Sequence, residues 1–272
     1  MIVVSGSKRS GTSAWMQLLA AAGLPVIGDR IPASWEALAA DFNPDGFYES
    51  ELSAGIYYRT NPHPRSGAYL FPEQTRGHAV KVFPPGVVRS DVAFLDRVLV
   101  TLRGWRAQSV SMSRMRAGTA ASVDPALALA PVYEWWSDVF GLLRDVATRR
   151  YAVHFVAYEA LLADPAAVIG EVLGWIGGGD RAAATAAVRV RPEVDAPGDA
   201  DAPAPPPDLA AEHVAVFDAL HDHVRRGVPL TPSLVAELNR TDAALRPRLL
   251  AHNARLKDAA VDRLLAEARG GP

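Results

Sequence analysis

The feature that most constrains this chain is a glycine-rich segment, Gly6–Ser13, that lies between two apolar stretches. The stretch before it, Met1–Val4, is apolar and β-branched, which predicts a buried strand. The stretch after it, Ala14–Ala22, carries apolar side chains at helical spacing and predicts a helix that ends at Gly23. A strand, a glycine loop and a helix in this order direct backbone N–H groups and a helix N-terminus at one point. The segment therefore predicts a loop that binds a phosphate.

Further apolar runs predict strands at residues 78–83, 97–102 and 151–157. Helical patterns alternate with them, among them 159–176, and such alternation is typical of parallel βαβ units. We therefore expect an α/β protein: a P-loop-like three-layer fold with a central, mostly parallel sheet. The 272 residues suffice for one such domain with additional C-terminal helices.

The pattern divides the chain into three parts. Residues 1–190 are predicted to form the α/β domain. Residues 191–208 are dominated by Pro, Ala and Asp and are typical of a linker or surface loop. Residues 209–272 are predicted to form a C-terminal helical extension.

The extension contains two helical stretches, 209–226 and 233–268. Leucines recur along the second one from Leu234 to Leu264, and Pro247 is expected to kink or break it. Two interpretations of these leucines stay open. They form a tail packed on the domain, or they bind a partner, with a homodimer as the simplest case.

Composition excludes several classes of protein. The absence of cysteine excludes a disulfide scaffold, a thiol nucleophile and a cysteine-ligated metal. The formal net charge of −2 argues against a nucleic-acid partner, because such proteins usually carry a basic excess. No apolar run is long enough for a membrane span, and the early charges follow the apolar run, unlike in a signal peptide. We expect a cytoplasmic protein with no membrane partner.

The positions of the cations indicate the type of chemistry. A nucleoside triphosphatase has Lys directly after the second glycine of its loop, and that position is Thr12 here. The cations come earlier, at Lys8 and Arg9. The predicted strand 97–102 is followed by Arg103, where a magnesium-dependent enzyme needs an acid. This pattern favours an anionic nucleotide held by basic and hydroxyl side chains without a metal.

A second basic segment, 97–116, contains five arginines and no acid. Arg103 follows the predicted strand, and Ser111 comes eight positions later in the next predicted helix. A guanidinium and a hydroxyl can hold one phosphate from two sides. Ligands of open α/β sheets bind at the carboxyl ends of the strands, so we expect this segment and the glycine loop to meet there. The alternative is a solvated basic helix face.

These segments resemble motifs of the PAPS-dependent sulfotransferases, where PAPS is 3′-phosphoadenosine 5′-phosphosulfate. Residues 8–13, Lys-Arg-Ser-Gly-Thr-Ser, are similar to the family's 5′-phosphosulfate loop, with Lys8 in place of the usual proline. Residues 103–106, Arg-Gly-Trp-Arg, with Ser111 are similar to the 3′-phosphate motif, although Gly-Trp replaces Asp-Pro. Two further segments, 43–49 and 158–165, are similar to motifs that bacterial members carry in the same order.

The resemblance implies PAPS as the donor substrate, no metal, and a hydroxyl or amine acceptor on a small molecule or glycan. The 5′-phosphosulfate would contact Lys8, Arg9, Ser10, Gly11, Thr12 and Ser13. Arg103 and Ser111 would hold the 3′-phosphate, and Tyr158 would lie near the adenine.

Sulfuryl transfer needs a base for the acceptor's proton and positive charge beside the transferring oxygens. Arg9 is the candidate for charge stabilisation, since a guanidinium cannot act as an acid. The histidine that cytosolic members use is absent from the corresponding stretch, 81–85. Glu49 is the preferred base, beside two aromatic residues after a turn. Lys81 and His78 remain as alternatives.

Two other functions stay open on the sequence: a P-loop kinase or NTPase with a degenerate Walker A motif, and a non-catalytic nucleotide-binding partner protein. Several aromatic residues are candidates for an acceptor pocket, although such residues more often belong to the core. They are Tyr57, Tyr58, Phe71, Trp135 and Trp136.

Overall fold

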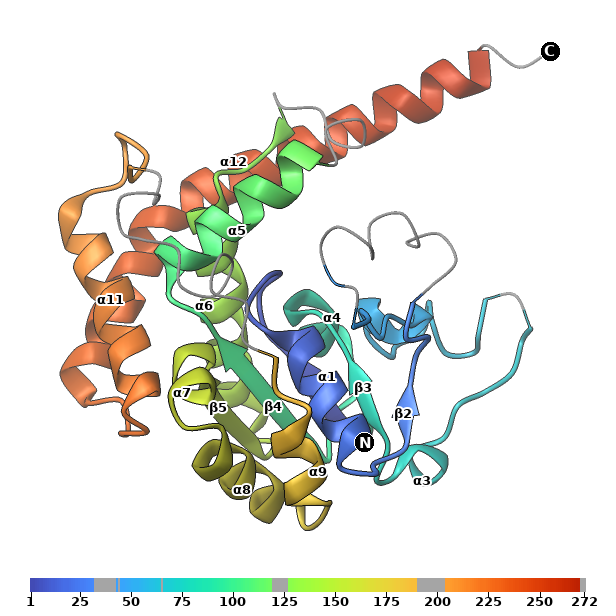
Figure 1. The fold of residues 1–272 in the computed structure, drawn as a ribbon. Coiled ribbons are helices and arrows are strands. Elements are labelled where there is room, and N and C mark those ends of the chain that lie inside the picture. Colours follow the sequence, from blue (N-terminus) through green and yellow to red (C-terminus); the bar gives the residue numbers. More distant parts are fainter. Residues whose placement is uncertain (32–42, 44, 65, 119–126, 190–203, 270–272) are drawn as a thin grey trace.

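The computed structural model describes residues 1–31, 43, 45–64, 66–118, 127–189 and 204–269, and Figure 1 shows their course. Five strands form one sheet in the order β2 (Val26–Ile27), β3 (Ala79–Lys81), β1 (Ile2–Ser5), β4 (Arg97–Leu102) and β5 (Val153–Ala157). Every neighbouring pair in this sheet is parallel. The predicted α/β class and central parallel sheet are therefore confirmed.

The helices surround this sheet. In chain order they are α1 (Thr12–Ala21), α3 (Pro72–Thr75), α4 (Pro84–Arg89), α5 (Trp105–Gly118), α6 (Pro131–Arg149), α7 (Tyr158–Ala163), α8 (Pro165–Ile176), α9 (Arg181–Ala186), α11 (Ala211–Arg225) and α12 (Pro232–Arg269). Of two short 3₁₀ helices, η2 (Glu51–Ala54) precedes β3 and η3 (Val92–Phe94) follows α4.

The sequence analysis predicted one helix over 159–176, and this is wrong. Asp164 separates α7 from α8, because its carboxylate accepts a hydrogen bond from Ala167 N (3.0 Å) and so caps α8.

The strands place alternate side chains in two apolar layers, as the twofold period of a strand requires. Val4 and Leu99 point to the side covered by α1, α7, α8 and α9. Val3 and Val98 point to the opposite side, where they pack with residues of α4 and α6. The sheet is therefore the middle of three layers.

The C-terminal helices α11 and α12 share an apolar cluster with α5 and α6. Phe217 of α11 is fully buried, and its ring centroid lies 6.4, 5.5 and 4.8 Å from those of Trp105, Trp135 and Trp136. Trp135 and Trp136 are thus core residues, which is the alternative that the sequence analysis favoured for such aromatics, and they do not line an acceptor pocket. The extension packs on the α/β core through these rings. Residues 191–203 of the predicted linker lie outside the described residues.

Helix α12 continues through Pro247, so of the two outcomes predicted there, a kink or a break, the break is wrong. Loss of one backbone hydrogen bond does not end this helix, whose preceding turns are anchored by the buried Leu238 and Leu245. Farther along, α12 extends away from the rest of the molecule and exposes Leu256 and Leu264 (Figure 1). A dimer contact through this part stays a prediction. Within the described part of the chain, no helix combines the length and apolarity that a membrane crossing needs.

Candidate functional site

A pocket opens at the carboxyl edge of the sheet, at the end of β1. The chain runs from β3 to β4 on the opposite side of β1, so the strand order reverses direction at this point. Such switch points are the usual ligand-binding positions of open α/β sheets. The predicted site residues that line this pocket are Lys8, Arg9, Gly11, Thr12, Ser13, Glu49, Lys81, Arg103 and Tyr158.

Two glycines determine the course of the loop after β1. A Cβ on Gly6 would lie 2.3 Å from Thr101 O, and the φ of Gly6 is +151°. A Cβ on Gly11, where φ is +98°, would lie 2.4 Å from the ring of Tyr158. Gly11 is also the N-cap of α1, and no side chain caps this helix. The N–H groups of its first turn have no intrahelical partner, which suits them to an anion at the loop.

Ser10 differs from the other residues of the loop. It is fully buried, and it does not belong to the pocket lining. Its backbone N donates to Ser7 O (3.1 Å), and its carbonyl accepts from Thr101 Oγ1 (2.8 Å). Ser10 therefore ties the loop to β4, and its hydroxyl does not face the space where the sequence analysis expected a donor contact.

Arg103 reaches the loop from the end of β4. Its Nη1 donates to Arg9 O at 3.5 Å, and its guanidinium carbon lies 5.3 Å from the centroid of the Tyr158 ring. The structure thus brings together the two basic segments that the sequence separates by 94 positions. Tyr158 lies between Gly11 and Arg103, at the start of α7.

Ser111 lies close to this group but does not line the pocket. Its Oγ accepts a hydrogen bond from Arg9 Nε at 3.0 Å, so it holds Arg9 from α5. Arg9 has a φ of +69°, in the left-handed region that residues other than glycine seldom adopt. Backbone conformations of this kind are concentrated at binding and catalytic sites.

Lys81 and Glu49 form an ion pair at the side of the pocket nearest β3. Lys81 Nζ lies 2.6 Å from Glu49 Oε1, and it also donates to Ser13 Oγ (3.1 Å) and Phe47 O (3.2 Å). Burial lowers the pKa of Lys81, and the charge and hydrogen bond of Glu49 oppose that effect. The pair joins β3, the first turn of α1 and the segment that carries Glu49.

The turn at Gly46 places Glu49 in this position. Asn43 Nδ2 and Gln17 Nε2 both donate to Gly46 O, at 2.6 and 2.9 Å, and so attach the turn to α1. A Cβ on Gly46, where φ is +112°, would lie 2.8 Å from Arg30 O. Asp29 N then donates to Glu49 O at 3.0 Å. The sequence motif over 43–49 therefore has a structural reason for its glycine.

The remaining candidate base, His78, lies elsewhere. It precedes β3 and so lies at the amino edge of the sheet, where its carbonyl accepts from Ile2 N at 2.8 Å. Its Nδ1 lies 3.3 Å from Arg76 O. The pocket is at the opposite edge, so the structure does not bring His78 to it. Tyr58 and Phe71 are exposed and also lie outside the lining.

The lining residues that sequence reasoning missed include Gln17, Phe47 and Arg189. Gln17 follows Ser13 by four positions on α1, a spacing that places both on one helix face and could have identified it. Phe47 was part of a recognised motif but was given no role. Arg189 follows α9 at the end of an alanine-rich stretch, and nothing in its sequence context indicates a site.

No protein-family model matches the chain, and no curated protein matches it either. A functional assignment therefore depends on the geometry of the pocket and on the chemistry of its lining.

Proposed function

We propose that this protein is a sulfotransferase that transfers a sulfuryl group from PAPS to a hydroxyl or amine of a small molecule or glycan. One observation carries the proposal: a single pocket combines the glycine loop, Arg103 and the Lys81–Glu49 pair. Two basic segments at one sheet edge suit a nucleotide with anionic groups at both ends. The carboxylate beside them suits removal of a proton from an acceptor. The chain's P-loop-like topology is part of this proposal.

The residues present fit such a donor. The uncapped start of α1 and the hydroxyls of Thr12 and Ser13 would hold the 5′ end. Arg103 would hold the 3′-phosphate by charge-assisted hydrogen bonds, and Tyr158 would contact the adenosine. Ser111 would act through Arg9, whose guanidinium it contacts.

The donor supplies the sulfuryl group and leaves as adenosine 3′,5′-bisphosphate. Glu49 would take the acceptor's proton on its carboxylate, which Lys81 orients through the 2.6 Å ion pair. Lys81 and Arg9 would place positive charge beside the oxygens that become more negative during transfer. Ser13 contacts Lys81 Nζ and so connects this charge to the loop.

A thermal-shift comparison tests the donor first. Adenosine 3′,5′-bisphosphate is expected to stabilise the protein, by about 2.7 kcal/mol at a hundred times its Kd, and ATP with magnesium is not. Stabilisation by ATP with magnesium alone would support the kinase alternative and overturn the proposal. Transfer of radioactive sulfate from PAPS to a panel of phenols, amines and glycans then tests catalysis. Nucleotide binding with no transfer to any acceptor class would favour the non-catalytic alternative.

Arg103→Ala tests the role of the second basic segment. The variant is expected to bind the bisphosphate about 10- to 100-fold more weakly, because it loses a charge-assisted contact of about 1.5–3 kcal/mol. The matched control is Arg114→Ala, which removes an exposed arginine of α5. Unchanged affinity in Arg103→Ala would contradict the assignment of the 3′-phosphate to this residue.

A further inference from the structure

We infer that helix α11 belongs to the donor-binding machinery, with Asp218 and His221 as positioning residues that hold the Arg103 segment in place. The inference rests on the proposed function, since it concerns the part of the pocket that would hold the 3′-phosphate. Neither residue lines the pocket. Both would act through the backbone and side chains of residues 103–106.

Asp218 holds the two residues that follow Gly104. Its Oδ1 accepts from Trp105 Nε1 at 2.8 Å and from Arg106 Nη1 at 2.7 Å. The Arg106 guanidinium lies 4.4 Å from the centroid of the Trp105 ring, so cation and indole form one unit on the carboxylate. Proline in place of Trp105, as in the family motif that this segment resembles, would have no N–H to give to Asp218.

His221 holds the segment through Glu159. His221 Nε2 and Glu159 Oε2 are 2.9 Å apart, and Glu159 Oε1 accepts from Gly104 N at 2.9 Å. Burial alone would raise the pKa of Glu159, but His221 and the N–H of Gly104 outweigh it and lower the pKa. Glu159 therefore stays ionised and anchors the backbone N–H that follows Arg103.

Phe217 completes the same face of α11. Its ring packs on Trp135, whose Nε1 donates to Arg103 O at 2.9 Å. Residues 217, 218 and 221 lie on one helix face. Through Trp135 and Glu159, this face supports the carbonyl and the N–H of the peptide group that joins Arg103 to Gly104. A guanidinium that must meet an anion within hydrogen-bond distance depends on such support, because displacement of a binding group by about 1 Å weakens its contacts strongly.

The test compares two ligands on the full chain, adenosine 3′,5′-bisphosphate and adenosine 5′-phosphate, by isothermal titration calorimetry. Asp218→Ala is expected to weaken bisphosphate binding by about tenfold and 5′-phosphate binding by less than about twofold. Asp218→Asn keeps an acceptor for Trp105 Nε1 and is expected to restore part of the affinity. A residue with a merely structural role would not change the ratio of the two affinities.

The same measurements in an Arg103→Ala background show whether Asp218 acts through Arg103. If it does, Asp218→Ala causes no additional loss there, since the effects of coupled residues are not additive. The matched control is Asp222→Ala on the same helix, which removes a carboxylate paired with Arg225 and Arg226 at 2.7 and 2.8 Å. That control is expected to leave both affinities unchanged.

The outcomes separate the two proposals. If the wild-type protein does not bind the bisphosphate, the proposed function is overturned, and the inference about α11 with it. If the wild-type protein binds it but Asp218→Ala weakens both ligands equally, or adds fully to Arg103→Ala, only the inference is overturned. Should Asp218→Ala fail to fold, Trp105→Phe and His221→Leu remove the two links separately and are judged by the same ratio.

Discussion

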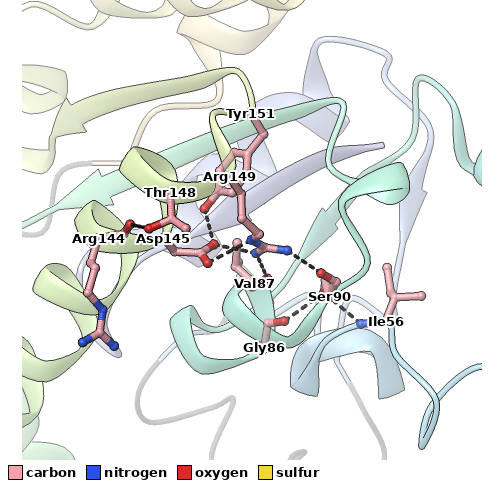
Figure 2. A network of polar contacts seen from close by, with 9 residues as sticks. All are labelled: Ile56, Gly86, Val87, Ser90, Arg144, Asp145, Thr148, Arg149 and Tyr151. Carbon is pink, nitrogen blue, oxygen red and sulfur yellow. Dashed lines mark hydrogen bonds and ion pairs between the residues drawn. The ribbon is translucent and has the colours of Figure 1, made fainter.

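Two largely buried cation–carboxylate pairs of this protein, Lys81–Glu49 and Arg149–Asp145, use similar chemistry in different surroundings. Lys81 borders the pocket, and the atoms it contacts belong to the segments that form that pocket. Arg149 lies at the end of α6, and Figure 2 shows its guanidinium directed at Asp145 and at the end of α4.

The second pair also contacts main-chain carbonyls and a tyrosine hydroxyl. Arg149 donates to Ser90 O (2.6 Å) and Val87 O (2.7 Å), which are carbonyls at the C-terminal end of α4. Its Nε donates to Asp145 Oδ1 at 2.9 Å, and Tyr151 OH donates to Asp145 Oδ2 at 2.9 Å. Burial and the hydrogen bond to Asp145 raise the pKa of Tyr151, so its hydroxyl remains a donor.

The groups that contact an ion pair therefore indicate its role better than the residue types that form the pair. Arg149 joins two helices by donating to two carbonyls at the end of α4. Lys81 instead donates to the Ser13 hydroxyl in the first turn of α1 and to the Phe47 carbonyl, two residues before Glu49. We therefore expect loss of the first pair to reduce stability and loss of the second to reduce turnover.

The largest expected effect is that of Arg149→Ala on stability. The variant leaves the Asp145 carboxylate without its cation and removes the side-chain donor of Ser90 O and Val87 O, which should cost about 3–5 kcal/mol. Urea unfolding monitored by circular dichroism gives the value. The matched control, Arg144→Ala, removes an exposed arginine one turn earlier on α6, labelled in Figure 2, and should change stability by less than about 0.5 kcal/mol. If Arg149→Ala lowered the free energy of unfolding by less than about 1 kcal/mol, the stabilising role assigned to this pair would be contradicted.

Glu49→Gln is expected to have its main effect on turnover. Removing a general base should lower kcat by about 10²–10³-fold, while the affinity for adenosine 3′,5′-bisphosphate stays within about threefold. Single-turnover transfer from PAPS and calorimetric titration measure the two quantities. Asp145→Asn makes the same chemical change outside the pocket and serves as the control. The folded fraction of this variant should keep the kcat of the wild-type protein. A fully active Glu49→Gln variant would exclude Glu49 as the base.

Replacing both members of each pair by apolar residues separates the two roles further. Lys81→Met with Glu49→Leu should change stability by less than about 1 kcal/mol, because well-packed apolar residues often replace a buried ion pair without loss. Arg149→Met with Asp145→Leu should still cost about 2–3 kcal/mol, because Ser90 O and the Tyr151 hydroxyl lose these partners. Equal unfolding free energies for the two double variants would contradict this difference.

The sequence predicted the part of the fold that depends on local pattern. The apolar run of β4 and the strand–glycine–helix order around Gly11 determine local structure directly. The approach of Arg103 to the loop also followed, because parallel strands with adjacent carboxyl ends leave few other arrangements.

The rest of the site depends on contacts between distant residues. Ser10 is buried because Gly6 allows β4 to approach the loop closely, and no local pattern shows which loop hydroxyl turns inward. Asp218 lies 113 positions from Trp105, on a helix whose sequence indicates only an amphipathic surface. On the sequence alone, Trp135 fits either a pocket or a core, and its packing against the buried Phe217 places it in the core. Apart from the missed boundary at Asp164, the residues that the sequence analysis misplaced therefore depend on tertiary packing and not on periodicity.

The smallest expected effect concerns pH and the Lys81 ammonium. The pKa of a lysine in the unfolded chain is about 10.4, and burial lowers the pKa of Lys81 in the folded protein. Between these two values the unfolded chain binds more protons, so linkage makes the free energy of unfolding rise with pH. Lys81→Met should therefore lose a positive slope of at most about 1.4 kcal/mol per pH unit in that window.

Urea unfolding at a series of alkaline pH values measures this slope. Lys257→Met is the control, because it removes an exposed lysine of α12 from a chain that has only three. Its slope should match that of the wild-type protein. If Lys81→Met also keeps the wild-type slope, the ammonium has the same free energy in both states and the pocket does not desolvate it. Lys81 would then be an ordinary solvated lysine beside Glu49. The proposed role of its charge in orienting the Glu49 carboxylate would be contradicted.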